Sequence, residues 1–369
     1  MATMAPRLRP SHPPPMKYLS RILLSTLALV GVEVSVGFAD TWRIIVLPDT
    51  QNYVNLDNDF DMNGTSDYLH HFQTQIDWIV ANKDALNIIF VSHCGDIVEH
   101  VEVVPPALEW MDADQVMSGL DGILPYGAVA GNHDILNTGV FPFNYVTFFG
   151  PARYASYPWY GGASTNGLNH YQKFQVRGSY GLYRFTNISM QWQLPGNVND
   201  PSTPMGWVQR VIDRESPLSN ILLTTHATID VNGQFGSETF GLVDENTPEE
   251  VRDELLRPNR RALDLVFSAH YHLPTDGAAL NFIGNRPVML SNYQDFPEGG
   301  TGYLRIVEFI EGGGMTSPDL IQIRTYSPSL DQYLLDADNE FSFEMDFASS
   351  LNPQPDPTPI GGGRGITKP

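Results

Sequence analysis

The stretch "RIIVLPDTQNYV", residues 43–54, decides how the fold is interpreted. The apolar, β-branched run Trp42–Leu47 predicts a buried strand that stops at Pro48. Asp49 and Gln51 follow at once, in the loop beyond the strand. A carboxylate at the end of a buried strand is typical of a residue that holds a ligand, because binding sites gather at strand ends in α/β proteins. The stretch therefore predicts an α/β fold with a binding site at this edge.

Similar apolar runs recur along the chain and alternate with helical patterns. Strands are predicted at Ile88–Ser92, Gly127–Ala130, Ile221–Thr225, Leu265–Ala269 and Val288–Ser291. Residues 66–83, 106–120 and 247–257 have helical spacing, and Thr247 begins the last of these with a capping-box pattern that Glu250 completes. Strands that alternate with helices favour an α/β class with partly parallel strands.

Two regions lack this alternation. Within residues 141–196, Tyr171–Val176 and Tyr180–Phe185 predict a hairpin, and residues 302–327 predict a second strand pair joined by a glycine-rich turn. Such antiparallel strands extend the parallel core. We therefore expect two sheets that pack face to face and are covered by helices, without a domain break.

The two ends of the chain differ from its middle. Residues 1–39 combine a Pro-rich leader, Lys17 and Arg21, an apolar run and small residues, which predicts a leader and signal peptide. Residues 40–350 form the predicted domain, and the Pro/Gly-rich residues 351–369 predict a disordered tail. We expect a secreted protein, extracellular or periplasmic, with no membrane span beyond the signal peptide.

Composition restricts the partners. The chain has 369 residues, and without residues 1–39 its formal charge is 17 − 41 = −24. This charge disfavours nucleic acid as a partner and attracts divalent cations. The lone cysteine, Cys94, excludes an internal disulfide and a thiolate cluster. The sequence does not indicate an oligomeric state.

Polar residues follow five of the predicted strands. They are Asp49 and Gln51, Asp96, Asn132 with His133 and Asp134, His226, and finally His270 with His272. Singly, each has an ordinary explanation as a turn, cap or packing residue. Five such coincidences at successive strand ends instead favour one site. Carboxylates, imidazoles and amides suit two divalent metal ions, with Asp96 as the natural bridge.

The order of the motifs DTQ, GDIVE, GNHD, TTH and AHYH resembles that of the calcineurin-like metallophosphoesterases. The resemblance spans residues 42–291 and is strongest to a secreted subgroup with D-T-Q in place of D-x-H. It implies a four-layer α/β/β/α sandwich. It also implies hydrolysis of phosphomono- or diesters by a hydroxide that bridges two divalent metal ions, which are Mn, Zn or Fe.

The resemblance also implies residue roles. One metal would be held by Asp49, Gln51, Asp96 and His272, and the other by Asp96, Asn132, His226 and His270. His133 would lie over the phosphate as an acid or charge stabiliser, oriented by Asp134. Gln51 is a departure, because most members have His at that position. Glu99 replaces the tyrosine ligand of purple acid phosphatases, so a tyrosinate centre is not expected.

Other residues carry weaker expectations. His70 and His71 are interpreted as structural, His93 as a packing residue or a support for the Asp96 loop, and His100 either as lining the cleft or as structural. The aromatic segment 141–159 either walls the cleft or packs onto the core, and packing is favoured. Arg153 and Arg177 are the candidate substrate-binding cations.

The sequence thus predicts a hydrolase for a small phosphoester, with a nucleotide among the candidates. The competing hypothesis is a non-catalytic, metal-stabilised binding or surface protein. His133 argues against it, because a purely structural metal site would have no need of that residue.

Overall fold

The structure, a computed structural model, describes residues 41–101, 107–135, 142–313 and 317–349. The predicted signal peptide and tail lie outside these ranges. Every helix within them is too short or too polar to cross a lipid bilayer.

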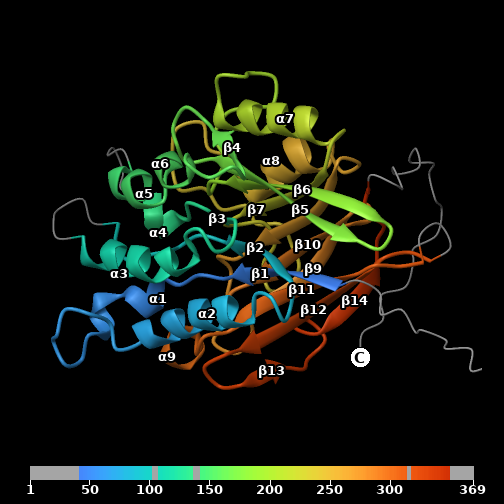
Figure 1. Cartoon of the computed structure of the whole chain (residues 1–369). Helices are drawn as coiled ribbons and strands as arrows, with labels where there is room; N and C mark the ends of the chain where they lie inside the picture. The colour runs from blue at the N-terminus through green and yellow to red at the C-terminus, as the bar shows by residue number, and fades with distance from the viewer. Residues whose placement is uncertain (1–40, 102–106, 136–141, 314–316, 350–369) are drawn as a thin grey trace, which may run out of the picture. The chain divides into compact units, whose positions relative to one another are not determined.

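Fourteen strands in the described ranges form two sheets of seven (Figure 1). Sheet A has the order β13 (Gln332–Leu334), β12 (Leu320–Ser327), β11 (Leu304–Ile310), β1 (Thr41–Leu47), β2 (Ile88–His93) and β3 (Tyr126–Ala128), and β14 (Phe341–Glu344) also pairs with β12. Sheet B has the order β4 (Tyr160–Ala163), β5 (His170–Gly178), β6 (Gly181–Met190), β7 (Asn220–Thr225), β8 (Leu263–Ser268), β10 (Arg286–Ser291) and β9 (Ala278–Ile283).

The middle of each sheet is parallel. β1, β2 and β3 run in one direction in sheet A, and β6, β7, β8 and β10 do so in sheet B. The flanking strands are antiparallel; β1 pairs with β11, for example, with Thr41 opposite Ile310. The carboxyl ends of parallel strands lie at one edge of a sheet. The loops that follow the parallel strands therefore lie at that edge in each sheet.

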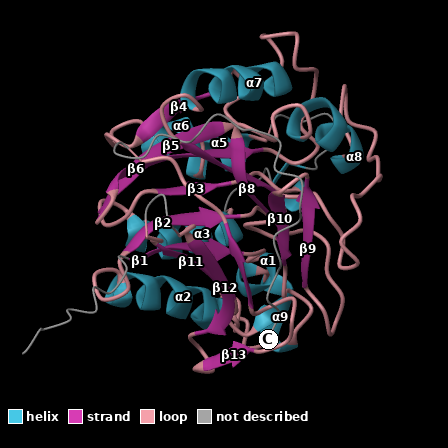
Figure 2. Ribbon diagram, turned by 90° about the vertical axis from the view of Figure 1, so that its right-hand side faces the viewer, coloured by secondary structure: helices cyan, strands magenta, loops and turns pink. Residues whose placement is uncertain are grey.

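Alternation along the strands builds the layers. In β1, Ile44 and Val46 enter the core between the sheets, whereas Ile45 and Leu47 face the helices. On that outer face of sheet A lie α2 (Leu69–Asn82) and α3 (Leu108–Met117). The outer face of sheet B is covered by α7 (Pro204–Glu215) and α8 (Pro248–Val251). Figure 2 shows α2 and α7 on opposite outer sides of the two sheets. The predicted four-layer sandwich is confirmed.

Short elements fill the connections. They are α1 (Gln51–Val54), α4 (Asn132–Ile135), α5 (Phe143–Phe148), α6 (Pro151–Tyr154), α9 (Pro297–Gly300), the 3₁₀ turns Leu56–Asn58 and Ser118–Leu120, and the π-helical turn Arg252–Leu256 that extends α8. The capping box of Thr247 and Glu250 is present. The preferred interpretation of the aromatic segment is confirmed in its described part, because Tyr145, Phe149 and Tyr154 are buried in the core under α3.

Candidate metal centre

The predicted strand-end residues of the two sheets lie close together. Asp49 follows β1 and Asp96 follows β2, while Asn132 begins α4 just after β3. From sheet B, His226 follows β7 and His270 follows β8. These five residues, Asp49, Asp96, Asn132, His226 and His270, together with the side chains that contact them, are called here the strand-end centre.

His226 lies in the middle of the centre, with its side chain fully buried. Its Nδ1–H donates to the carbonyl oxygen of Cys94 over 2.9 Å. Its Nε2 lies 2.9 Å from Asn132 Oδ1, 3.1 Å from Asp96 Oδ2 and 3.1 Å from His270 Nδ1. One potential ligand atom each from Asp96, His226 and His270 falls within 4.8 Å of the others. Sequence-distant donors therefore surround a single volume.

The backbone is bent into unusual conformations to allow this approach. Asp96 and His270 have φ values of 48° and 70°, which non-glycine residues rarely adopt. Gly95, which directly precedes Asp96, has φ 100°. A Cβ on Gly95 would come within 2.9 Å of Gly131 N and of His226 Nδ1. Only glycine fits where the loops meet this closely. Strain at two donor residues indicates that their positions are functional.

The donor set fits divalent metal ions. Asp49 Oδ1 and Gln51 Oε1 are buried and make no hydrogen bond. Three carboxylates, those of Asp49, Asp96 and Asp134, are almost fully buried. No lysine or arginine in the described ranges forms an ion pair with any of them. The imidazole of His226 is the basic side chain that faces Asp49 and Asp96, so bound metal ions would add positive charge beside these carboxylates and contact the two oxygens that make no hydrogen bond.

Charge also couples the donors to one another. Burial raises the pKa of Asp49 well above its usual value. Burial alone would raise the pKa of Asp96, but the His226 imidazolium outweighs it and the pKa is lowered. For His226, burial is in turn outweighed by Asp96 and Asp49, which raise its pKa to about 9. Burial and His226 lower the pKa of His270 to about 3. In the protein alone, His226 thus carries the positive charge of this region.

A polar chain after β10 supports the edge of the centre and was missed by the sequence reasoning. Asn292 Nδ2 donates to Asp49 Oδ2 over 2.6 Å and to the carbonyl oxygen of His270 over 3.1 Å. Gln294 Nε2 lies 2.8 Å from His272 Nε2, and His272 Nδ1 lies 2.9 Å from Asp295 Oδ2. In the protein alone, His272 is hydrogen-bonded to this chain, and its role as a metal ligand stays a prediction. Asn292 and Gln294 follow the predicted strand Val288–Ser291. Their position just after a strand could have indicated that they belong to the site.

His133 is held by Asp96 and Glu99, and the expectation that Asp134 orients it is wrong. The His133 amide donates to Asp96 Oδ1 over 2.9 Å, and its Nδ1–H donates to the carbonyl oxygen of Glu99 over 2.8 Å. Asp134 is fully buried, and burial and Asp96 raise its pKa to about 7. Its carboxylate instead accepts from the amides of Ile97, Val98 and Gly131. Asp134 therefore ties the loops after β2 and β3 together.

His93 supports the Asp49 loop from beneath. Its Nδ1 accepts from the Gly95 amide over 3.1 Å, so its Nε2–H donates to Thr50 Oγ1 over 2.9 Å. Burial lowers the pKa of His93 to about 3, which keeps the ring neutral. Its predicted packing and supporting role agrees with these contacts. His100 instead pairs with Glu109 over 2.8 Å, and that hydrogen bond raises its pKa.

Arg153 is not available to a substrate, so its prediction is wrong. Its side chain is 8% exposed and forms ion pairs with Asp114 and Asp121. It also donates to the Tyr126 hydroxyl, and its guanidinium lies 5.0 Å from the centre of the Phe149 ring. These contacts fix α6 to α3 and β3 and leave no group facing the centre.

Arg177 is also misassigned, for a topological reason. It is exposed and lies at the end of β5, in the hairpin that begins β6. Because β6 runs parallel to β7, this hairpin lies at the opposite end of sheet B from His226. No substrate bound at the centre would reach it.

Comparisons with known proteins agree with this geometry. A family model described as calcineurin-like phosphoesterase matches residues 43–274. The uncharacterized protein YvnB of Bacillus subtilis is 30% identical over 324 residues, which are 83% of this chain and 22% of YvnB. The chain thus spans about a fifth of that relative's length.

The solved structures to which the chain is similar are distant in sequence. A dimetal phosphatase from Danio rerio is 12% identical with a TM-score of 0.48, covering 82% of this chain and 98% of its own. A purple acid phosphatase from yellow lupin (Lupinus luteus) is 12% identical with a TM-score of 0.46, covering 88% of this chain and 58% of its own.

Proposed function

Because the chain belongs to the calcineurin-like phosphoesterase family, we propose that it is a secreted hydrolase of small phosphomono- or diesters that works with two divalent metal ions. The observation that carries the proposal is the strand-end centre. There, buried oxygens of Asp49 and Gln51 make no hydrogen bond beside the cluster of Asp96, His226 and His270. Secretion rests on the signal-like residues 1–39.

The residues divide into ligands and supports. Asp49, Gln51, Asp96 and His272 would hold one ion, and Asp96, Asn132, His226 and His270 the other. When bound, such ions activate water and neutralise charge on the phosphate. Asn292 orients Asp49 through its 2.6 Å hydrogen bond, so that Asp49 Oδ1 is left for an ion.

His133 supplies the proton chemistry in this proposal. Its Nδ1–H is committed to the Glu99 carbonyl, so Nε2 is the nitrogen left for the substrate. Its side chain is 32% exposed, whereas that of His226 is fully buried. A partly exposed ring beside buried donors suits a group that takes up a proton at Nε2 and, as the imidazolium, gives that proton to a departing oxygen. The ring is held by the Glu99 carbonyl, and the Glu99 carboxylate lies 3.6 Å from the same Nδ1.

The substrate class follows from charge and access. The acidic chain repels long polyanions, which favours small phosphoesters, nucleotides included, over nucleic acid. Arg153 and Arg177 do not serve a second phosphate, since one is buried in ion pairs and the other lies at the far end of sheet B.

The test is hydrolysis of p-nitrophenyl phosphate and bis-p-nitrophenyl phosphate by the purified chain loaded with Mn²⁺, Zn²⁺ or Fe²⁺. Turnover of either substrate that is lost on chelation and restored by metal supports the proposal. Glu254→Gln, which alters an exposed carboxylate of the π-helical turn, serves as the matched control and should retain full activity. Metal binding at the centre without turnover would support the non-catalytic alternative.

A further inference from the structure

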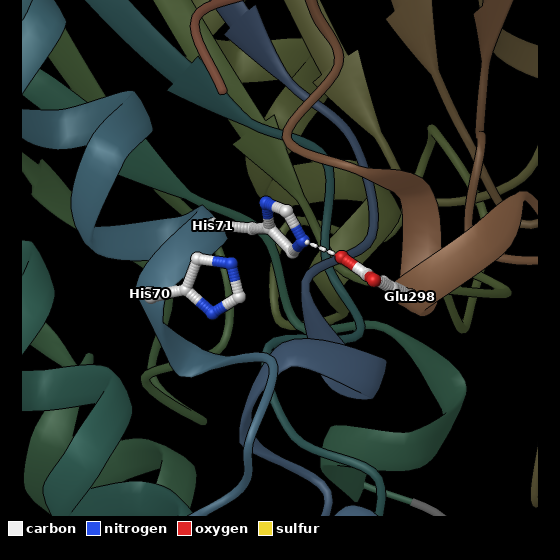
Figure 3. Close-up of side chains that lie close together, drawn as sticks. All are labelled: His70, His71 and Glu298. Carbon is white, nitrogen blue, oxygen red and sulfur yellow. Dashed lines mark hydrogen bonds and ion pairs between the residues drawn. The ribbon is translucent and has the colours of Figure 1, made fainter. Parts of the chain in front are cut away.

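A second group of metal-ligand side chains lies outside the strand-end centre. Figure 3 shows His70 and His71 side by side on α2, with Glu298 of α9 opposite them. The ligand atoms of the three residues fall within 4.8 Å of one another. The two imidazole ring centres are 3.9 Å apart. None of the three contacts the strand-end centre in any hydrogen bond or ion pair of the described residues.

The hydrogen bonds of the two rings leave Nε2 of His70 for a ligand, whereas Nε2 of His71 faces the Glu298 carboxylate and would exchange that hydrogen bond for an ion. His70 Nδ1–H donates to the carbonyl oxygen of Asp67 over 2.9 Å, which fixes the tautomer and leaves Nε2 with a free lone pair. His71 Nδ1 lies 2.9 Å from Ser329 Oγ, and its Nε2 lies 2.8 Å from Glu298 Oε2. Ligating histidines in proteins are held in this way, with the second ring nitrogen bonded to a carbonyl or hydroxyl.

The third candidate ligand, Glu298, lies in a tight turn. Glu298 has φ 55° in a turn where Gly299 and Thr301 also have positive φ. Its side chain remains 53% exposed, so an ion can reach it from solvent. His71, in contrast, is buried, so the three side chains combine one buried imidazole with two exposed groups.

We propose that His70, His71 and Glu298 form a third metal site, for a borderline transition ion such as Zn²⁺. Two imidazoles and one carboxylate suit Zn²⁺ better than Mg²⁺ or Ca²⁺, which prefer all-oxygen ligands. Three protein ligands leave one position open to water. The site is therefore exchangeable rather than a closed structural site.

The ion would fasten the segment that supports the strand-end centre. Glu298 belongs to the same connection as Asn292 and Gln294, which contact Asp49 and His272. Further along, the Gly302 amide donates to the Tyr53 hydroxyl over 2.9 Å. An ion between α2 and α9 would add a further tie to residues 292–302, beside these hydrogen bonds. Its expected effect is slower hydrogen exchange in that segment when Zn²⁺ is bound.

The test counts Zn²⁺ bound to the purified chain and to two variants. His70→Ala and Glu298→Gln avoid the buried His71, so both are expected to fold. Each should remove one equivalent of Zn²⁺ or lower the affinity of one site by at least about tenfold to 100-fold. Glu254→Gln, which also neutralises one exposed glutamate, should bind as the parent chain does.

Two measurements locate the ion and separate it from the proposed function. Repeating the titration in an Asp96→Ala background should leave the third equivalent in place, whatever that change does to hydrolysis. Anomalous diffraction at the zinc edge should show a peak between the two rings and Glu298. Unchanged stoichiometry and affinity in both variants, or no slowing of exchange in residues 292–302, would overturn the proposal.

Discussion

Two buried polar regions of this protein handle charge in opposite ways. Around Arg153, the chain provides its own cation, and Asp114 and Asp121 pair with it. In the strand-end centre, Asp49 and Asp96 are buried without any arginine or lysine partner among the described residues. In the first region the cation is an arginine, which stays charged, whereas in the second it is the His226 imidazolium, which must lose its proton before Nε2 can bind a metal ion. This contrast separates a structural ion-pair network from a metal centre.

The largest effect is expected from removing the residue shared by both ligand sets. Asp96→Ala should lower kcat/KM for the nitrophenyl esters by about 1,000-fold or more, because several kcal/mol of charge stabilisation depend on the bound ions. Steady-state kinetics and elemental analysis on the same sample measure both consequences. Retained metal content together with retained hydrolysis would refute the assignment of the centre.

Arg153 tests the other side of the comparison. Arg153→Met should lower the free energy of unfolding by about 3 kcal/mol, because it leaves Asp114 and Asp121 without their cation in a partly buried place. Urea denaturation measures this loss. The folded variant should keep its KM, and a large rise in KM would restore Arg153 as a substrate contact.

His170 makes the Arg153 region sensitive to acid. Its Nε2–H donates to the Ala128 carbonyl over 2.9 Å, and burial lowers its pKa to about 4. The unfolded chain, with a pKa near 6.5, binds the proton first, so stability is lost as pH falls from about 6.5 to 4. The loss should approach about 3 kcal/mol. Denaturation experiments across this pH range should show that the free energy of unfolding of His170→Gln depends less on pH than that of the parent chain.

His133 should affect rate without affecting metal. His133→Ala is expected to lower kcat by about 100-fold, since it removes only proton transfer. Elemental analysis should find the metal content of the parent chain. A variant that loses metal as well would place His133 among the ligands instead.

The smallest effect concerns Gln51. Imidazole is a stronger donor than an amide oxygen, so Gln51→His should tighten one metal by about tenfold. Competition with a chromophoric chelator measures the change. The same affinity in the variant would mean that the orphaned Oε1 does not face an ion.

Much of this site could be predicted because its residues stand at fixed places in the sequence. Asp49, Asp96, Asn132, His226 and His270 each follow a parallel strand, and such strand ends meet wherever the strands do. The same logic predicted the two sheets and the capping box at Thr247. Amphipathic α7 was overlooked, although Thr203 caps it and its apolar face covers sheet B.

The failures share a different cause. Arg153 and Arg177 were judged by residue type and the Asp134–His133 pairing by family resemblance, and neither specifies where a side chain points. Asp134 turned to three backbone amides because its loop is buried against the neighbouring loop. Arg177 failed because a hairpin carries its tip to the far end of a sheet.

The sequence by itself determined the family, the layered fold and the chemical types of the donors, because strand periodicity and motif order are local properties. Tertiary structure alone decided which donors share one volume and which cations are already paired. It also placed Asn292 behind Asp49 and brought Glu298 to His71, across 243 and 227 positions of the chain. Such contacts depend on how the layers close over one another, and no local pattern records that.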